Sequence, residues 1–146
     1  MTDPTATGPA TTGPPDAARS GLPLAVTAIV TMVLIALQFV LAGYGIFERQ
    51  YHKADDGWFE PHQVVGYLTL LATVALLVVT IMTRQGRSAS VRAAAVVVLA
   101  VLQPLFAGLG TDTNPWFGVL HALDAVVIAA LVGSLIGQGV RAGRTG

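Results

Sequence analysis

Four long apolar segments constrain the fold of this chain more than any other feature of its sequence. They lie at residues 22–47, 63–83, 91–109 and 117–137, and short polar stretches separate them. An α-helix needs roughly 20 residues to cross roughly 30 Å of hydrocarbon, and each segment is near that length. Because backbone groups in lipid must be hydrogen-bonded within their own segment, we expect four transmembrane helices.

The predicted fold class is therefore all-α, with a transmembrane four-helix bundle over residues 22–138. Residues 1–21 are rich in Thr, Pro, Gly and Ala and cannot bury enough apolar surface to offset the entropy of ordering, which predicts a disordered cytoplasmic tail. Residues 139–146 are expected to form a short cytoplasmic tail. Pro104 is expected to kink the third helix, because proline removes a helical hydrogen bond.

The composition agrees with a membrane protein and excludes several functions. The chain is 53% hydrophobic and 11% charged, whereas a soluble domain carries roughly 25% charged residues. It has no cysteine, which excludes disulfides, iron–sulfur clusters and thiol catalysis. Its formal net charge is zero, so no basic patch indicates nucleic acid as a partner, and the expected partner is the lipid bilayer.

The basic residues predict the orientation of the bundle. Six of the eight Lys and Arg residues lie on one side of the predicted helices, and these are Arg19, Arg84, Arg87, Arg92, Arg141 and Arg144. Positively charged loops stay in the cytoplasm, so we predict a multi-pass protein of the plasma membrane with both termini cytoplasmic. Trp58 and Trp116 are then expected at the outer interface, where indole rings are favoured.

An internal repeat divides the four segments into two tandem helical hairpins. Residues 37–45 (LQFVLAGYG) and 102–110 (LQPLFAGLG) share Leu, Gln, Ala and two Gly at the same places. Each stretch is followed by Trp-Phe, then by a histidine, and four residues later by a small residue. These last residues are His62 and Gly66 in the first copy and His121 and Ala125 in the second. The two copies have the same orientation and are expected to pack about a pseudo-two-fold axis along the membrane normal.

The two repeated histidines are the main candidates for a functional site. His62 and His121 open helices that both run inward, so we expect them at one depth, facing each other across the bundle. Two opposed imidazoles in a four-helix bundle are what a six-coordinate haem iron requires. We therefore predict haem b as the cofactor and the two histidines as its metal ligands.

Four further residues are assigned to the predicted cofactor site. Gly66 and Ala125 lie one turn from the histidines on the same helix faces and leave room for a flat macrocycle. Gln38 and Gln103 begin rows of small residues that let the first and third helices close on the ring or on each other, and interhelical hydrogen bonds are the favoured role of their amides. Three residues are placed to meet the propionates at the outer surface: Arg49, His52 and Lys53.

Two acidic residues are candidates for a proton relay, namely Asp124 and Glu60. Asp124 lies three residues beyond His121 on the same face, and carboxyl groups inside membranes are rare and usually functional. It is placed to orient His121 or to pass a proton to a quinone or substrate. A neutral acid hydrogen-bonded to Gln103 or to a backbone carbonyl is an equally good interpretation. Glu60 precedes His62 by two residues.

Three classes of function remain open. The first is a b-type membrane cytochrome that transfers electrons between a quinone or a redox partner and an outer acceptor. The second is a non-enzymatic accessory or assembly subunit without cofactor, in which the histidines serve packing or the interface. The third is a small transporter with proton sites at Asp124 and the histidines.

A zinc site is disfavoured, because no third or fourth ligand has suitable spacing. No catalytic residue is assigned, and enzymatic activity stays open. Gly133-x-x-x-Gly137 is expected either to pack helices within the bundle or to mark the face of a homodimer.

The motif Leu-Gln…Ala-Gly-x-Gly…Trp-Phe…His occurs twice between residues 22 and 137 and resembles one four-helix half of haem A synthase. That resemblance implies that His62 and His121 are axial ligands of a b-type haem. One bundle cannot hold both a substrate haem and an electron-transfer haem unless it dimerises, so haem A synthesis is not predicted. The chain also resembles a family of small four-helix bacterial membrane proteins of unknown function, which carry Pro-His-x-x-x-Gly and Leu-His-x-x-x-Ala motifs.

Overall fold

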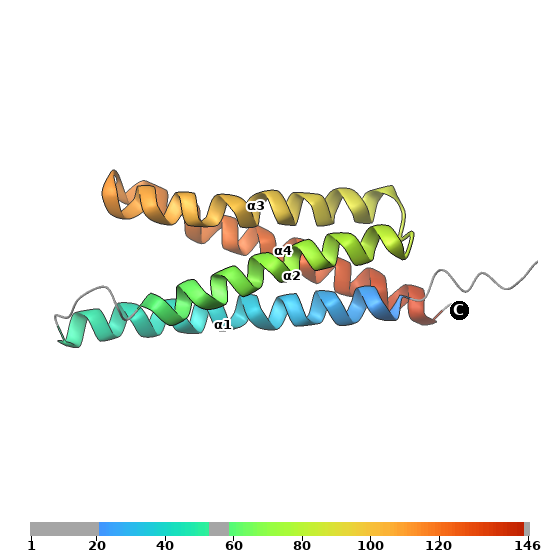
Figure 1. Cartoon of the computed structure of the whole chain (residues 1–146), viewed down its shortest axis with the longest axis horizontal. Coiled ribbons are helices and arrows are strands. Elements are labelled where there is room, and N and C mark those ends of the chain that lie inside the picture. The colour runs from blue at the N-terminus through green and yellow to red at the C-terminus, as the bar shows by residue number, and fades with distance from the viewer. Residues whose placement is uncertain (1–20, 53–58, 145–146) are drawn as a thin grey trace, which may run out of the picture.

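The computed structural model describes residues 21–52 and 59–144, and in these residues the chain is a bundle of four α-helices (Figure 1). The helices are α1 (Leu22–His52), α2 (Glu60–Met82), α3 (Arg87–Asp112) and α4 (Pro115–Arg144). All four are long and apolar enough to cross a membrane. The predicted fold class, an all-α transmembrane four-helix bundle of two tandem hairpins, is confirmed.

Each helix packs mainly on two neighbours, so the bundle is a ring in which α1 lies diagonal to α3. The principal contacts join α1 to α2, α2 to α3, α3 to α4 and α4 to α1. The α2–α3 connection, the start of α1 and the end of α4 share one end of the bundle (right in Figure 1), which we call the arginine end because Arg84 and Arg87 lie there. The opposite end carries His62 and His121 near the starts of α2 and α4, and we call it the histidine end.

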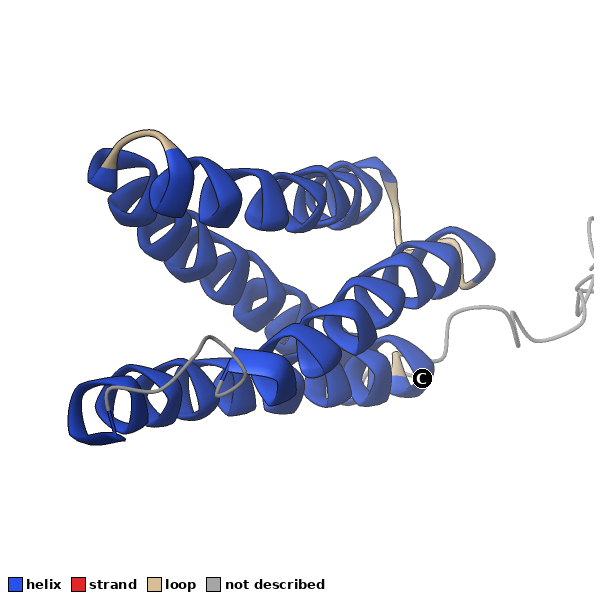
Figure 2. Cartoon of the chain, turned by 60° about the vertical axis from the view of Figure 1, so that its left-hand side comes forward, coloured by secondary structure: helices blue, strands red, loops and turns tan. Residues whose placement is uncertain are grey.

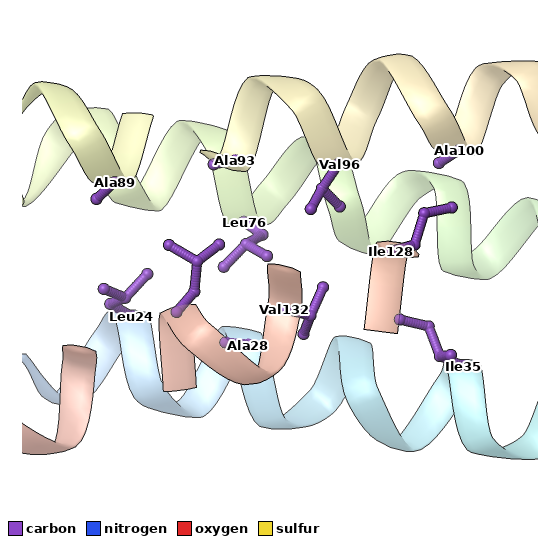
Figure 3. Packing of buried hydrophobic residues seen from close by; sticks show 11 residues of the cluster. Leu24, Ala28, Ile35, Leu76, Ala89, Ala93, Val96, Ala100, Ile128 and Val132 are labelled. Carbon is purple, nitrogen blue, oxygen red and sulfur yellow. The ribbon is translucent and has the colours of Figure 1, made fainter. Parts of the chain in front are cut away.

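The apolar core occupies the half of the bundle nearer the arginine end. Figure 3 shows the packing of its side chains. Its fully or nearly fully buried side chains are Leu24, Ala28, Ile35, Leu76, Ala89, Ala93, Val96, Ala100, Ile128, Val132 and Leu135. Towards the histidine end, the α1–α2 hairpin and the α3–α4 hairpin diverge (Figures 1 and 2). At the arginine end, buried small residues such as Ala28, Ala89 and Ala93 let the helix backbones approach closely.

The two hairpins approach closely where α1 meets α4. A Cβ atom added at Gly139 would lie 2.6 Å from the backbone nitrogen of Ala25 and 2.9 Å from its Cα atom. Only a residue without a side chain fits at that distance, so Gly139 sets the packing of the two helices.

The outer faces of all four helices carry exposed apolar side chains. Large examples are Val33, Val40, Leu71, Val98, Leu105, Leu123 and Val126. Exposure of so many large apolar groups on a monomer is expected where lipid rather than water surrounds the helices. The arrangement agrees with a multi-pass membrane protein.

The helices extend beyond the predicted apolar segments. The largest difference is at α4, which continues to Arg144 through most of the segment 139–146 that the sequence assigns to a tail. The packing of Gly139 on α1 and the favourable position of Arg141 in the last turn both support this extension. α3 is one continuous helix that includes Pro104. The predicted N-terminal tail and the interfacial position of Trp58 lie outside the described residues.

Candidate functional site

The two repeated histidines meet at the histidine end of the bundle. His62 lies in the first turn of α2, just after Pro61, and His121 lies near the start of α4. Their ring centroids are 6.4 Å apart and their ring planes are inclined by 67°. Both side chains are partly buried. The hairpins thus bring together two imidazoles that are 59 residues apart in the chain (121 minus 62).

Each histidine is fixed by a glutamine on the preceding helix. The Nδ1 atom of His62 lies 3.2 Å from the backbone carbonyl oxygen of Gln38, and the side-chain amide of Gln38 donates to the carbonyl of His62 at 3.0 Å. A carbonyl oxygen only accepts hydrogen bonds, so Nδ1 carries the proton. In the neutral ring this leaves Nε2 with an unshared electron pair, which is the form that binds metals.

The second hairpin repeats this arrangement atom for atom. Nδ1 of His121 lies 3.0 Å from the carbonyl oxygen of Gln103, and the amide of Gln103 donates to the carbonyl of His121 at 3.1 Å. Both glutamines therefore form the interhelical hydrogen bonds that the sequence favours. The sequence does not predict that their backbone carbonyls orient the rings, although the recurrence of Gln before His in both copies is the signal that points to this role.

Among the acidic residues of the described segments, only Asp124 is buried, with 8% of its surface exposed. Its Oδ2 atom accepts a hydrogen bond of 2.8 Å from the side-chain amide of Gln103. Of the interpretations left open by the sequence, the structure thus places Asp124 on Gln103, while Nδ1 of His121 points to a backbone carbonyl. Glu60 is exposed in the first turn of α2, where a negative charge stabilises the helix dipole.

The small residues of the two repeats have two different environments. Beside His62, a Cβ atom added at Gly66 would meet only the amide nitrogen of Gln38, at 3.6 Å. Ala125, its counterpart in the second copy, is partly buried. A Cβ atom added at Gly45 would lie 2.9 Å from the ring of Phe59. A Cβ atom added at Gly110 would lie 2.8 Å from the backbone nitrogen of Gly118. Gly45 and Gly110 pack within their own hairpins and do not close α1 on α3, because these two helices lie on a diagonal. The alternative expectation, that the rows of small residues close on a cofactor ring, stays a prediction.

The residues expected near propionates are only partly described. Arg49 is exposed near the end of α1, at the histidine end. Lys53 and the side chain of His52 lie outside the described part of the chain.

The donor set at this site consists of two imidazoles. Among the described residues, no group of three or more His, Cys, Asp or Glu side chains is arranged to hold a metal ion. A metal ion bound by protein side chains alone takes at least three ligands.

The fold and the histidine pair place the protein among the small polytopic α-helical membrane proteins. A model described as "Family of unknown function (DUF6220)" matches residues 38–112, from the middle of α1 to the end of α3, and the chain belongs to that family. The matched region contains Gln38, His62 and Gln103 and ends before His121. No curated protein and no solved structure matches the chain.

Proposed function

We propose that this protein binds a b-type haem through His62 and His121 and transfers electrons in the membrane. The observation that carries the proposal is the 6.4 Å separation of the two ring centroids. Imidazole nitrogens bind metals at about 2.0–2.1 Å, so two imidazoles on opposite sides of one metal ion have centroids roughly 6 Å apart. The separation in the bundle matches this value.

The hydrogen bonds around the two rings support the same ligation. Metal-binding histidines usually donate their second ring N–H to a carbonyl or carboxylate, which fixes the ring and raises the basicity of the ligand atom. The carbonyls of Gln38 and Gln103 have this role for His62 and His121. The same two bonds select the tautomer whose Nε2 is available.

The surroundings of the pair fit a flat macrocycle. The hairpins diverge at this end of the bundle, whereas the side-chain core fills the other half (Figures 2 and 3). Gly66 lies one turn from His62 with open space beyond the glutamine amide. A Cβ atom added at Gly43 or at Gly108, on the diagonal pair α1 and α3, would meet no other atom within 4 Å.

The proposal of electron transfer rests on the two histidine ligands that the haem iron would have. A haem iron supplies one-electron chemistry, and two histidine ligands leave no open position for a substrate. The protein's own part is to hold and orient both ligands and to keep them in apolar surroundings. A membrane quinone or a protein redox partner is the expected donor or acceptor. The likeness of the repeated motif to one half of haem A synthase supports the assignment by analogy.

The test is an absorption spectrum of the protein purified after expression with added haem. The wild type is expected to show a Soret band and sharp α and β bands in the reduced-minus-oxidised spectrum. His62→Ala and His121→Ala are each expected to lose the low-spin spectrum. Leu123→Ala, a change at an exposed apolar position of α4, should retain it. Absence of bound haem in the wild type, or unchanged spectra in both alanine variants, would refute the proposal.

A cofactor-free accessory or assembly subunit is the second candidate. The observation that favours it is the edge-to-face contact of the two rings, which together with the glutamine bonds can join the hairpins by packing alone. Under this function, His62→Phe combined with His121→Phe would preserve folding and any partner association. Loss of association in that double variant would count against it.

A further inference from the structure

A cavity of about 360 Å³ lies at the arginine end, away from the histidine pair. Residues of the α2–α3 connection and of the last turns of α4 line it: Arg84, Gln85, Gly86, Gln138 and Ala142. It opens at the ends of helices that are long enough to span a membrane. This is the level at which lipid headgroups meet a membrane protein.

The charge at this end is positive and has no carboxylate to balance it within the described residues. Five arginines lie there, namely Arg84, Arg87, Arg92, Arg141 and Arg144. No Asp or Glu occurs in residues 61–111 or 125–144. Clustered positive charge between helix ends creates a local potential that attracts anions.

A polar network holds the wall of the cavity in place. Arg92 donates to the hydroxyl of Ser134 at 2.8 Å and to the side-chain carbonyl of Gln138. The amide nitrogen of Gln138 donates in turn to the backbone carbonyl of Gln85 at 2.9 Å. The guanidinium of Arg92 is thus satisfied by neutral groups, and its charge is not cancelled.

The cavity wall also contains a hydrogen-bond donor that lacks an acceptor. The side-chain nitrogen of Gln85 is buried and has no partner among the described residues. An unpaired buried donor costs about 1–3 kcal/mol, so this nitrogen would gain from an acceptor bound beside it. Arg84, next to Gln85, is exposed. Gly86, with φ of 93°, precedes the first residue of α3 and provides no side-chain cap for that helix.

We propose that this cavity binds the phosphate of an acidic phospholipid headgroup. Its lining offers hydrogen-bond donors and positive charge, which is the chemistry that recognises a phosphate. Its position at the membrane surface favours a lipid over a free anion. Its volume is at the lower end of the range of about 300–1,000 Å³ for small-molecule sites and suits a headgroup rather than a whole lipid.

The experiment compares lipid binding to the full-length protein in nanodiscs of phosphatidylcholine with and without phosphatidylglycerol. Retained lipid is counted by native mass spectrometry, and the unfolding temperature is recorded in parallel. The wild type should retain phosphatidylglycerol and unfold at a higher temperature in its presence. Arg84→Gln should weaken binding by about tenfold or more, as expected for loss of one charge-assisted hydrogen bond. Gln85→Ala should also weaken it, without any change of charge.

Arg87→Gln is the matched control. Arg87 lies in the same basic region but does not line the cavity. The Arg87→Gln variant should therefore bind phosphatidylglycerol less than about fivefold more weakly than the wild type, because it loses only diffuse electrostatic attraction. Equal losses in Arg84→Gln and Arg87→Gln, or equal retention of both lipids by the wild type, would overturn the proposal. Inorganic phosphate alone should not raise the unfolding temperature; if it does so as well as phosphatidylglycerol, the site belongs to a free anion and the lipid assignment is wrong.

Discussion

The side-chain amide of Gln103 donates a 2.8 Å hydrogen bond to the carboxyl group of Asp124, and this bond breaks the symmetry of the two hairpins. In the first hairpin, the position three residues beyond the histidine is occupied by Val65 instead of an acid. Gln38 accordingly makes one side-chain hydrogen bond where Gln103 makes two. The two histidines thus have the same tether but different polar surroundings.

Replacement of Asp124 by valine, the residue of the matching position, is expected to destabilise the bundle by about 1–3 kcal/mol, because one buried N–H of Gln103 loses its acceptor. Asp124→Asn keeps an acceptor oxygen and should cost less than about 1 kcal/mol. Reversible unfolding in mixed detergent micelles measures both values. A valine variant as stable as the wild type would show that this hydrogen bond contributes nothing.

The internal repeat supplies its own matched pair for the glutamines. Gln103→Leu removes two hydrogen bonds and leaves the buried Asp124 without its donor, whereas Gln38→Leu removes one. We expect Gln103→Leu to lower the free energy of unfolding by about 1 kcal/mol more than Gln38→Leu does. Equal losses, measured in the same unfolding assay, would contradict the asymmetry of the site.

Gly139 is expected to tolerate no side chain. Gly139→Ala places a methyl group 2.6 Å from the backbone of Ala25 and should destabilise the α1–α4 contact by about 1–3 kcal/mol. Gly133→Ala in the same helix is the control, because its nearest neighbour is the flexible end of Met32 at 3.7 Å. That variant should be neutral, or more stable by about 0.5–1 kcal/mol. The reverse order of the two unfolding temperatures would show that α1 and α4 do not pack closely at Gly139.

Two leucines of α2 distinguish core from lipid-facing positions. Leu76 is fully buried, and Leu76→Ala should cost about 2–5 kcal/mol. Leu71 is 66% exposed, and Leu71→Ala should change stability by no more than about 0.5 kcal/mol. If both variants lost the same stability, Leu71 would be buried in an interface, such as a contact with a second copy.

The orientation predicted from the arginines can be tested by labelling, because the native chain has no cysteine. Ser88→Cys at the arginine end and Thr113→Cys at the histidine end introduce single thiols at exposed positions. A membrane-impermeant maleimide should label Thr113→Cys in intact cells and Ser88→Cys only after permeabilisation. The opposite pattern would reverse the predicted topology.

The sequence by itself determines the number and approximate positions of the helices. Each apolar segment is long enough to span the hydrocarbon layer, and a span in lipid must be helical to satisfy its backbone. The repeat of Gln and His also identifies the hairpins as two copies of one unit, and both copies form the same pair of hydrogen bonds. These features depend on local spacing, which the order of residues carries directly.

Only the tertiary structure decides which helices are neighbours and what each small residue contacts. The sequence places Gly45 and Gly110 in the repeated motif and Gly139 in a tail, yet the first two pack within hairpins and Gly139 joins the two hairpins. The end of α4 is also set by packing on α1, since composition alone predicts a tail there. Which helices are neighbours depends on surfaces that meet only when the two hairpins assemble. The 6.4 Å distance between the ring centroids of His62 and His121 depends on the same assembly.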